Sequence, residues 1–172
     1  MRRGNELELA VNINSTICAK PFVKWAGGKG QLLNTFEQYY PLMLPEGSVK
    51  YYIEPFAGGG AVLFNILQKY KIEEAFIFDI NEDLINAYTV IKNDIDTLVE
   101  YLFDLERKYL NFDEKFRKEM YYEIRDVYNS QAYKSKQPDI QRAAQFIFLN
   151  RTCFNGLYRV NRSGYFNVPH GD

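Results

Sequence analysis

The chain has 172 residues, of which 47% are hydrophobic and 25% charged, so it is long enough to bury one hydrophobic core. Its 21 Lys and Arg nearly balance its 22 Asp and Glu, and the net charge of -1 gives the whole chain no electrostatic preference for nucleic acid or for a membrane surface. A single histidine and two cysteines far apart in the sequence exclude a metal site built from several imidazoles or thiolates, so no metal is expected.

The charges are unevenly distributed along the chain. Residues 71–133 carry 8 basic and 15 acidic side chains, whereas residues 140–171 carry four arginines and no carboxylate. Only this last segment favours contact with phosphate groups. No apolar run approaches the roughly 20 residues that cross a bilayer, and the N-terminus lacks the pattern of a signal peptide. We therefore expect a cytoplasmic protein that does not bind membranes.

The first structured region is predicted to begin with a glycine-rich segment. Residues 1–20 show weak periodicity, which predicts a short strand or a loose arm. The glycine-rich segment follows at residues 24–30, and the apolar spacing of residues 31–36 then predicts a helix. Glycines placed just before a helix leave backbone N–H groups unobstructed, so another group can approach the backbone closely here.

A second glycine turn lies inside a strand–helix–strand pattern. Residues 51–54 have the composition of a buried strand, which leads into the glycine turn 54–60 and then into a predicted helix at 61–67. The next predicted strand covers residues 75–78 and ends on Asp79. Strand, glycine turn, helix, strand and carboxylate in this order predict one βαβ unit of a parallel, doubly wound sheet.

The middle of the chain is predicted to be helical. One helix is expected at residues 82–93, and the charged segment 95–129 carries apolar stripes typical of a small helical bundle. The polar residues 130–138 predict a loop, and residues 140–149 predict a further apolar helix. This arrangement does not continue the sheet.

The C-terminal residues have the pattern of a β-hairpin. Residues 157–160 and 165–168 flank the polar turn 161–164, where Gly164 can adopt a positive φ at little cost. A solvated ribbon at the edge of the molecule is the alternative interpretation of this segment. Its arginines and aromatic residues favour a binding role.

The second glycine turn and Asp79 together predict a nucleoside site. The turn follows a strand, and ligands of open α/β sheets bind at this end of the strands. Asp79 follows Gly58 by 21 residues. That interval brings a carboxylate from the neighbouring strand over the same crevice, where it can accept hydrogen bonds from both hydroxyls of an adenosine ribose.

Alternatives remain for these residues. Asp79 is of a residue type that often caps the N-terminus of a helix. Trp25, the single tryptophan, is a candidate for core packing, and Lys29 can be a solvated residue at a helix start. A phosphate-binding P-loop is disfavoured because Lys29 is not followed by Ser or Thr. A dinucleotide site is disfavoured because residues 58–60 lack the third glycine of the usual spacing and no second βαβ half is evident.

Four motifs give the chain a family resemblance. Residues 24–29, 54–61, 79–85 and 154–161 occur in the order seen in Dam-type, or D12 class, adenine-specific DNA methyltransferases. Together they extend over nearly the whole of residues 20–171. The chain resembles the N-terminal part of orphan and restriction-modification enzymes that methylate adenine in GATC or a related short site.

The resemblance implies an α/β fold that contains a partial Rossmann-like sheet of an S-adenosyl-L-methionine-dependent methyltransferase, with an inserted helical DNA-binding region and a β-hairpin. The implied cofactor-binding domain covers residues 1–92, and the implied target-recognition region covers residues 93–172. The cofactor would be S-adenosyl-L-methionine and the partner double-stranded DNA. The implied reaction transfers the cofactor's methyl group to the N6 amine of adenine.

Site residues are implied for both ligands. Asp79 would hold the ribose, and the residues expected around the cofactor are Trp25, Ala26, Gly27, Lys29, Phe56, Gly58, Gly60 and Asp79. Arg159 matches the family's base-reading arginine, whose bidentate pairing with guanine is the commonest specific major-groove contact. The remaining residues expected at DNA are Phe154 and Asn155, which would fill the gap left by the flipped adenine, Arg151 and Arg162 at phosphates, and Leu157 and Asn167.

The sequence departs from the family in one respect. The family's chemistry depends on an Asp-Pro-Pro-Tyr motif that binds the flipped adenine, and this motif does not occur in residues 1–172. We therefore expect no catalytic residue in the chain, no methyl transfer by the chain alone, and exposed sheet edges. It would be a truncated or split methyltransferase that needs a C-terminal complementing segment. The alternative is a non-catalytic fragment that binds DNA or the cofactor.

Overall fold

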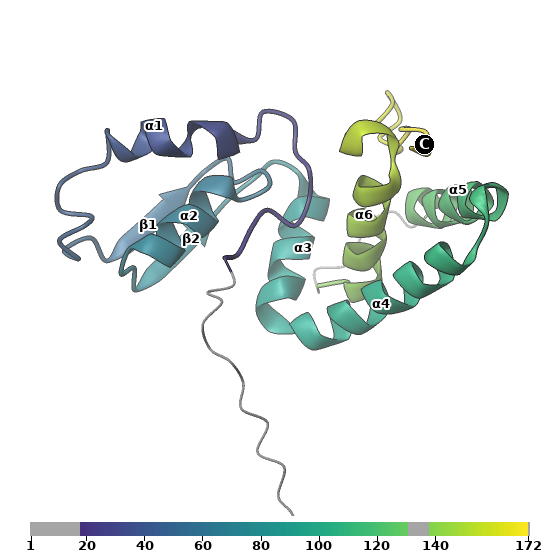
Figure 1. Cartoon of the computed structure of the whole chain (residues 1–172), viewed down its shortest axis with the longest axis horizontal. Coiled ribbons are helices and arrows are strands. Elements are labelled where there is room, and N and C mark those ends of the chain that lie inside the picture. Colours follow the sequence, from purple (N-terminus) through teal and green to yellow (C-terminus); the bar gives the residue numbers. More distant parts are fainter. Residues whose placement is uncertain (1–17, 131–137, 172) are drawn as a thin grey trace, which may run out of the picture.

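The computed structural model describes residues 18–130 and 138–171. The strand or arm expected at 1–20 therefore lies almost wholly outside the described residues, as does the loop expected at 130–138. Figure 1 shows two parts joined by one helix: a small sheet with short helices on one side of the molecule, and a group of longer helices on the other.

The elements alternate between helix and strand and then become helical. In chain order they are a 3-10 turn at Lys29–Leu32, α1 (Leu33–Glu37), β1 (Tyr51–Glu54), α2 (Ala61–Lys69), β2 (Glu74–Ile77), α3 (Glu82–Asn93), α4 (Ile95–Asn111), α5 (Glu114–Ser130), α6 (Ile140–Thr152) and a second 3-10 turn at Phe154–Gly156. The helices and strands expected between residues 31 and 149 are thus present, and the charged segment 95–129 divides into α4 and α5.

Strands β1 and β2 form a two-stranded parallel sheet, with Tyr52 beside Ala75 and Ile53 beside Phe76. The parallel pairing confirms the predicted strand–helix–strand unit. The prediction that β1 is buried was wrong for one of its faces: Glu54 is buried, whereas Ile53 is 63% exposed. Successive side chains of a strand point to opposite faces, and only the face that carries Tyr52 and Glu54 packs against the core.

Helix α3 connects the two parts, and its start is fixed by side-chain capping. The Asn81 amide oxygen accepts a hydrogen bond from the Leu84 N–H at 2.8 Å, and Glu82 and Asp83 place negative charge in the first turn. Asp94 then caps α4 by accepting from the Thr97 N–H at 3.3 Å. The cap of α3 is Asn81, so the alternative reading of Asp79 as the N-cap was wrong.

The hydrophobic core is centred on α6. All residues from 142 to 150 are buried, and α6 packs against α3, α4 and α5. The largest fully buried core side chains include Tyr121, Phe146, Leu84 and Leu98. Because α6 touches the other three long helices, it fixes their relative positions (Figure 1).

A buried ion pair joins α3 to α6. The Arg142 guanidinium binds both carboxylate oxygens of Asp83, with Nε 2.5 Å from Oδ1 and Nη2 3.2 Å from Oδ2. The Tyr128 hydroxyl donates to the same carboxylate at 2.5 Å, and Arg142 Nη1 donates to the Tyr128 carbonyl at 2.9 Å. The buried charges are therefore paired and hydrogen-bonded, as burial of charge requires.

Three asparagine side chains on helices each bind both backbone groups of a residue outside their own helix. Asn86 pairs with the N–H and carbonyl of Asp139, and Asn129 pairs in the same way with Phe166. Asn150 pairs with both groups of Lys24, at 2.8 and 2.9 Å, and also donates to the Gly156 carbonyl. These amides hold the chain next to α6 without any sheet pairing.

The expected β-hairpin at 157–168 is only partly formed. The chain does reverse direction, but it forms a single bridge, between Val160 and Phe166, rather than two strands. The Asn161 side chain accepts from two N–H groups of the turn, and Phe166 gives its backbone groups to Asn129. The Tyr165 N–H, which a regular hairpin would pair with the Asn161 carbonyl, binds the Asn161 side chain instead, so the strand pairing does not continue from the bridge toward the turn. We call residues 157–168 the arginine loop.

Candidate functional site

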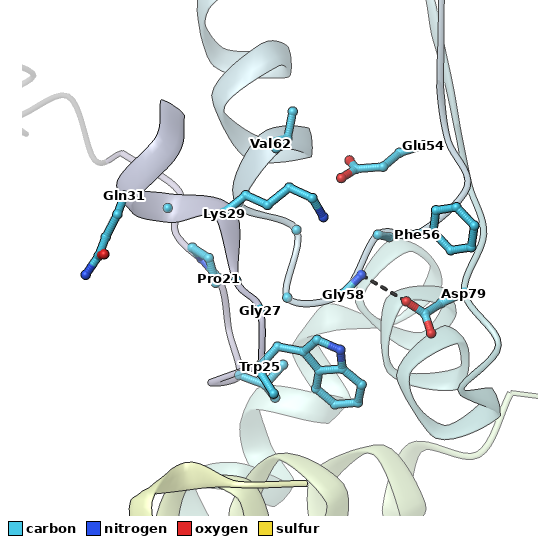
Figure 2. A pocket seen from close by; sticks show the side chains of 18 residues that line it. Pro21, Trp25, Gly27, Lys29, Gln31, Glu54, Phe56, Gly58, Val62 and Asp79 are labelled. Carbon is cyan, nitrogen blue, oxygen red and sulfur yellow. Dashed lines mark hydrogen bonds between the residues drawn. The ribbon is translucent and has the colours of Figure 1, made fainter. Parts of the chain in front are cut away.

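A cavity of about 560 Å³ opens where β1 and β2 end, a size within the range of small-molecule sites. Three segments line it: residues from the 21–31 segment, the end of β1 with the turn and first residues of α2, and Asp79 after β2. Figure 2 shows these segments around the opening. All eight residues expected around a cofactor line this one cavity: Trp25, Ala26, Gly27, Lys29, Phe56, Gly58, Gly60 and Asp79.

The Asp79 carboxylate is held by the backbone on both of its oxygens. Oδ2 accepts from the Gly58 N–H at 3.0 Å, and Oδ1 accepts from the Asn81 N–H at 3.0 Å (Figure 2 shows the first bond). A carboxylate has about four acceptor positions, so one on each oxygen remains for a ligand. The two strand ends therefore present a fixed acceptor pair to the cavity.

Glycine is required at two positions of the second turn. Gly60 has φ +80°, and a Cβ built there would lie 2.4 Å from the Tyr88 hydroxyl oxygen. Gly58 has φ +51°, and a Cβ there would lie 3.0 Å from Cδ1 of Trp25. The Tyr88 hydroxyl also donates to the Gly58 carbonyl at 2.9 Å. The turn is thus fixed from both sides, because α3 supplies Tyr88 and the first glycine segment supplies Trp25.

Trp25 lines the cavity and also packs against the core. Its indole lines the cavity and stacks on Tyr158, with ring centroids 5.3 Å apart and an interplanar angle of 27°. It also approaches the core residue Phe146 at 6.2 Å between centroids. Core packing therefore fixes the position of a cavity wall.

Glu54 is a cavity residue that the sequence reasoning missed. It is 8% exposed, and its Oε2 accepts from the Tyr52 hydroxyl at 2.8 Å. Burial raises the pKa of the Glu54 carboxyl, while the Tyr52 hydroxyl and the Lys29 ammonium act to lower it. Lys29 extends across the opening toward Glu54 (Figure 2). The sequence feature that could have identified Glu54 is its position at the end of β1, where the strand leads into the glycine turn.

The arginine loop carries four of the seven residues expected at DNA: Leu157, Arg159, Arg162 and Asn167. Arg159 Nε donates to the Asn167 side-chain oxygen at 2.8 Å, so the two side chains orient each other. Arg162 is exposed in the turn. Leu157, at the start of the loop, is 40% exposed. These residues lie on a segment that projects at the end of α6 (Figure 1).

The three other residues expected at DNA lie at the end of α6 or just after it. Phe154 is 49% exposed, and Asn155 follows it with φ +56°, the single positive φ outside glycine among the described residues. Arg151 lies in the last turn of α6, where its Nε donates to the Phe22 carbonyl at 3.0 Å and its side chain borders a second cavity between α4 and α6. The backbone of the 21–31 segment therefore orients the Arg151 side chain.

Within residues 18–130 and 138–171, no three His, Cys, Asp or Glu side chains gather as metal ligands would. No helix there has the length and apolar character needed to span a membrane.

The fold and the cavity define an α/β protein in which two glycine segments and a carboxylate meet at the ends of two parallel strands. Residues 25–172 match the model of the D12 class N6 adenine-specific DNA methyltransferases, and the chain belongs to this family. The resemblance expected from the four motifs is thereby confirmed.

The chain is similar to several named DNA methyltransferases. The chain is 56% identical over 152 residues to the type II methyltransferase M.MjaIII of Methanocaldococcus jannaschii, an alignment that covers 88% of this chain and 52% of the relative. It is 37% identical over 152 residues to the DNA adenine methylase of Serratia marcescens, with coverage of 88% and 49%. The DNA N-6-adenine-methyltransferase of Escherichia phage P1 is 41% identical over 148 residues, with coverage of 86% and 17%. The chain thus spans about half the length of the first two.

Proposed function

We propose that the chain is the cofactor-binding and DNA-contacting part of a site-specific methyltransferase that transfers a methyl group from S-adenosyl-L-methionine to the N6 amine of adenine in a short duplex site such as GATC. The observation that carries this proposal is the meeting of all eight expected cofactor residues around one cavity at the ends of β1 and β2. Family membership supports the same reaction class.

The residues of the cavity fit S-adenosyl-L-methionine. Asp79 retains one acceptor position on each oxygen, which matches the two hydroxyls of a ribose. The glycine turn lets a ligand approach the backbone, and Trp25 and Phe56 offer aromatic surface beside it. The bound cofactor would supply the methyl group, and the chain would hold it in place.

The arginine loop is the proposed contact with DNA. Residues 140–171 contain four arginines and no carboxylate, and two of these arginines are exposed on the loop. Arg159 is oriented by Asn167, as a base-reading side chain needs to be, whereas exposed Arg162 suits a phosphate. Exposed Phe154 suits insertion between bases. A DNA substrate agrees with the cytoplasmic location expected from the sequence.

In this proposal the two parts of the molecule have different roles, one in binding the cofactor and one in binding DNA. Residues 1–92 would form part of a Rossmann-like cofactor domain, and residues 93–172 the inserted target-recognition region. The parallel β1–β2 pair with α2 between the strands in sequence supports the first assignment. Because the chain spans about half of the first two relatives described, a complementing C-terminal segment would supply the remaining strands.

Calorimetric titration tests the cofactor site. We expect the chain to bind S-adenosylhomocysteine, a non-reactive analogue, and Asp79→Ala to weaken binding by more than about tenfold, because roughly 1.4 kcal/mol of ribose hydrogen bonding corresponds to that factor. Asp96→Asn, at an exposed acid in the first turn of α4, is the matched control and should bind normally. Equal affinity of the wild type and Asp79→Ala would contradict the proposed site.

A transfer assay tests the activity. Since residues 1–172 contain no Asp-Pro-Pro-Tyr, we expect no label to pass from methyl-labelled S-adenosylmethionine to a GATC duplex with this chain alone. Adding the C-terminal half of a D12 relative should restore transfer. The competing candidate is a non-catalytic fragment that binds DNA or the cofactor, and binding of both ligands without restored transfer would favour it.

A further inference from the structure

Tyr158 occupies a position between the cavity and the arginine loop. Its ring stacks on Trp25, a wall of the cavity, and also contacts Phe146 of α6 and Phe166 of the loop, each at 5.7 Å between centroids. The next residue along the chain is Arg159. One aromatic ring therefore touches the cavity wall, the core helix and the far side of the loop.

The hydroxyl group of Tyr158 is tied to the buried ion pair. It donates to Oδ2 of Asp83 at 3.4 Å, the oxygen that also accepts from Tyr128 and Arg142. Burial raises the pKa of this hydroxyl, and the Asp83 carboxylate adds to the rise. The hydroxyl thus remains protonated and donating at neutral pH. One end of the ring is held by α3, and its face is stacked on Trp25.

Contacts continue from Tyr158 in both directions. Toward the cavity, Trp25 lies against Gly58, and the Gly58 N–H binds Asp79. Toward the loop, Arg159 is bound to Asn167, and Asn167 donates its N–H to the Arg159 carbonyl at 3.1 Å. Since protein interiors are close-packed, a shift of the indole that accommodates a ligand displaces the stacked ring as well.

We propose that Tyr158 is a positioning residue that couples occupation of the Trp25 cavity to the placement of Arg159, so that cofactor and DNA each strengthen the binding of the other. This inference rests on the proposed function, which supplies the two ligands. The coupling is carried by the stack of Trp25 on Tyr158, and the Asp83 contact limits how the ring moves. Neither ligand needs to touch Tyr158.

Linkage between the two ligands measures the coupling directly. In the wild-type chain, a saturating GATC duplex should lower the Kd for S-adenosylhomocysteine at least about fivefold, the lower end of usual coupling between sites, and saturating S-adenosylhomocysteine should lower the Kd for the duplex by the same factor. Trp25 is the single tryptophan of the chain, so its fluorescence reports on the stack when duplex is added.

Variants separate the stack from the hydroxyl. Tyr158→Leu should remove the linkage factor and the duplex-induced change in Trp25 emission. Tyr158→Phe keeps the stacked ring and should retain most of both. Tyr165→Leu, at an exposed tyrosine of the same loop, is the control and should leave the linkage factor unchanged. Thermal unfolding identifies any variant that does not fold. If Tyr158→Leu does not fold, Tyr158→Phe carries the test, and its linkage factor should equal that of the wild type.

The outcomes separate this inference from the proposed function. Loss of linkage in Tyr158→Leu, with linkage kept in Tyr158→Phe and Tyr165→Leu, supports the coupling role. Equal linkage in wild type and Tyr158→Leu, or a wild type that binds both ligands independently, overturns the coupling role and leaves the proposed function standing. A wild type that binds neither S-adenosylhomocysteine nor duplex overturns both.

Discussion

At the scale of single residues, the two arginines of the loop differ in how they are held. Arg159 is bound through Nε to Asn167, which leaves its two terminal nitrogens in a defined orientation, although one of them lies 3.4 Å from the Asn167 carbonyl. Arg162 is exposed in the turn. A fixed guanidinium suits pairing with one base, and an exposed one suits the uniform charge of phosphates.

We therefore expect Arg159→Ala and Arg162→Ala to weaken DNA binding in different ways. Arg159→Ala should reduce discrimination at one guanine by about 1–3 kcal/mol, because it removes a bidentate base contact. Arg162→Ala should weaken binding to all duplexes alike and reduce the slope of log K against log salt by about one. Binding of cognate and base-substituted duplexes at several salt concentrations measures both effects. The same uniform loss in both variants would show that Arg159 does not read a base.

The buried Glu54 carboxyl predicts a pH dependence of stability. Its pKa is raised in the folded protein, chiefly by burial. A raised folded pKa adds stability that is fully present below the unfolded value of about 4.3 and is lost as pH rises through the folded pKa. Glu54→Gln removes this loss, so the stability of the variant relative to wild type should increase between about pH 4 and pH 7.

Urea unfolding of both proteins across this range measures the Glu54 effect. The stability of Glu54→Gln relative to wild type should rise by about 1.4 kcal/mol for each tenfold difference in the acid dissociation constant of Glu54 between the folded and unfolded states. The matched control is Glu46→Gln, at an exposed acid, which should change stability equally at both ends of the range. A stability difference between Glu54→Gln and wild type that does not vary with pH would contradict the assignment.

At the scale of elements, α3 joins the cavity to the helical part. It supplies Tyr88 to the glycine turn at one position and Asp83 to the buried ion pair at another, and it packs against α6 along its length. The bounds of α3 were predicted from the apolar spacing of residues 84–91, and the structure shows that Asn81 caps its start. Its partners were not predictable, because Arg142 lies 59 residues away and no local pattern pairs it with Asp83.

Breaking the ion pair should destabilise the junction of α3 and α6. Arg142→Met leaves the Asp83 carboxylate buried without its cation and should cost about 3–5 kcal/mol of unfolding free energy. The double variant Asp83→Leu/Arg142→Met should recover part of that loss, because no charge remains buried. Denaturant unfolding of wild type, Asp83→Leu, Arg142→Met and the double variant completes the cycle and gives the coupling energy.

An exposed ion pair provides the control for this cycle. Arg107 and Asp104 pair at 3.1 Å on the surface of α4, and Arg107→Met should cost no more than about 1 kcal/mol. Equal losses in Arg142→Met and Arg107→Met would mean that the buried pair does not hold α3 to α6.

At the scale of the whole molecule, one face of the sheet is covered and the other is open. Ile53 and Phe76 are neighbours on the open face, where they are 63% and 44% exposed, and Tyr51 and Phe78 extend the patch. The composition of β1 predicts a strand but not which of its faces is covered, because coverage depends on what packs there. The glycine turn and Asp79, in contrast, were predictable, since strand end, glycine turn and acid have a fixed order in sequence. Trp25, Lys29 and Phe56 were expected at the cavity only from the family resemblance.

This open face predicts self-association of the isolated chain. Contiguous exposed apolar patches promote association, so light scattering should show a mean mass that rises with concentration. Ile53→Lys should reduce this rise by placing a charge in the patch. Leu42→Lys alters an equally apolar residue that is 82% exposed outside the sheet and should have less effect. Association that is insensitive to Ile53→Lys would place the contact elsewhere.

The three asparagine amides that hold backbone groups bear on how such a protein can evolve. An amide that binds the N–H and carbonyl of Phe166 or Lys24 makes no demand on the side chains of those residues. The path of the chain next to α6 is therefore set by Asn129 and Asn150. Side chains at the tips of these segments can be exchanged while the path is kept, so under the proposed function new target sequences could be acquired without rebuilding the helices beneath.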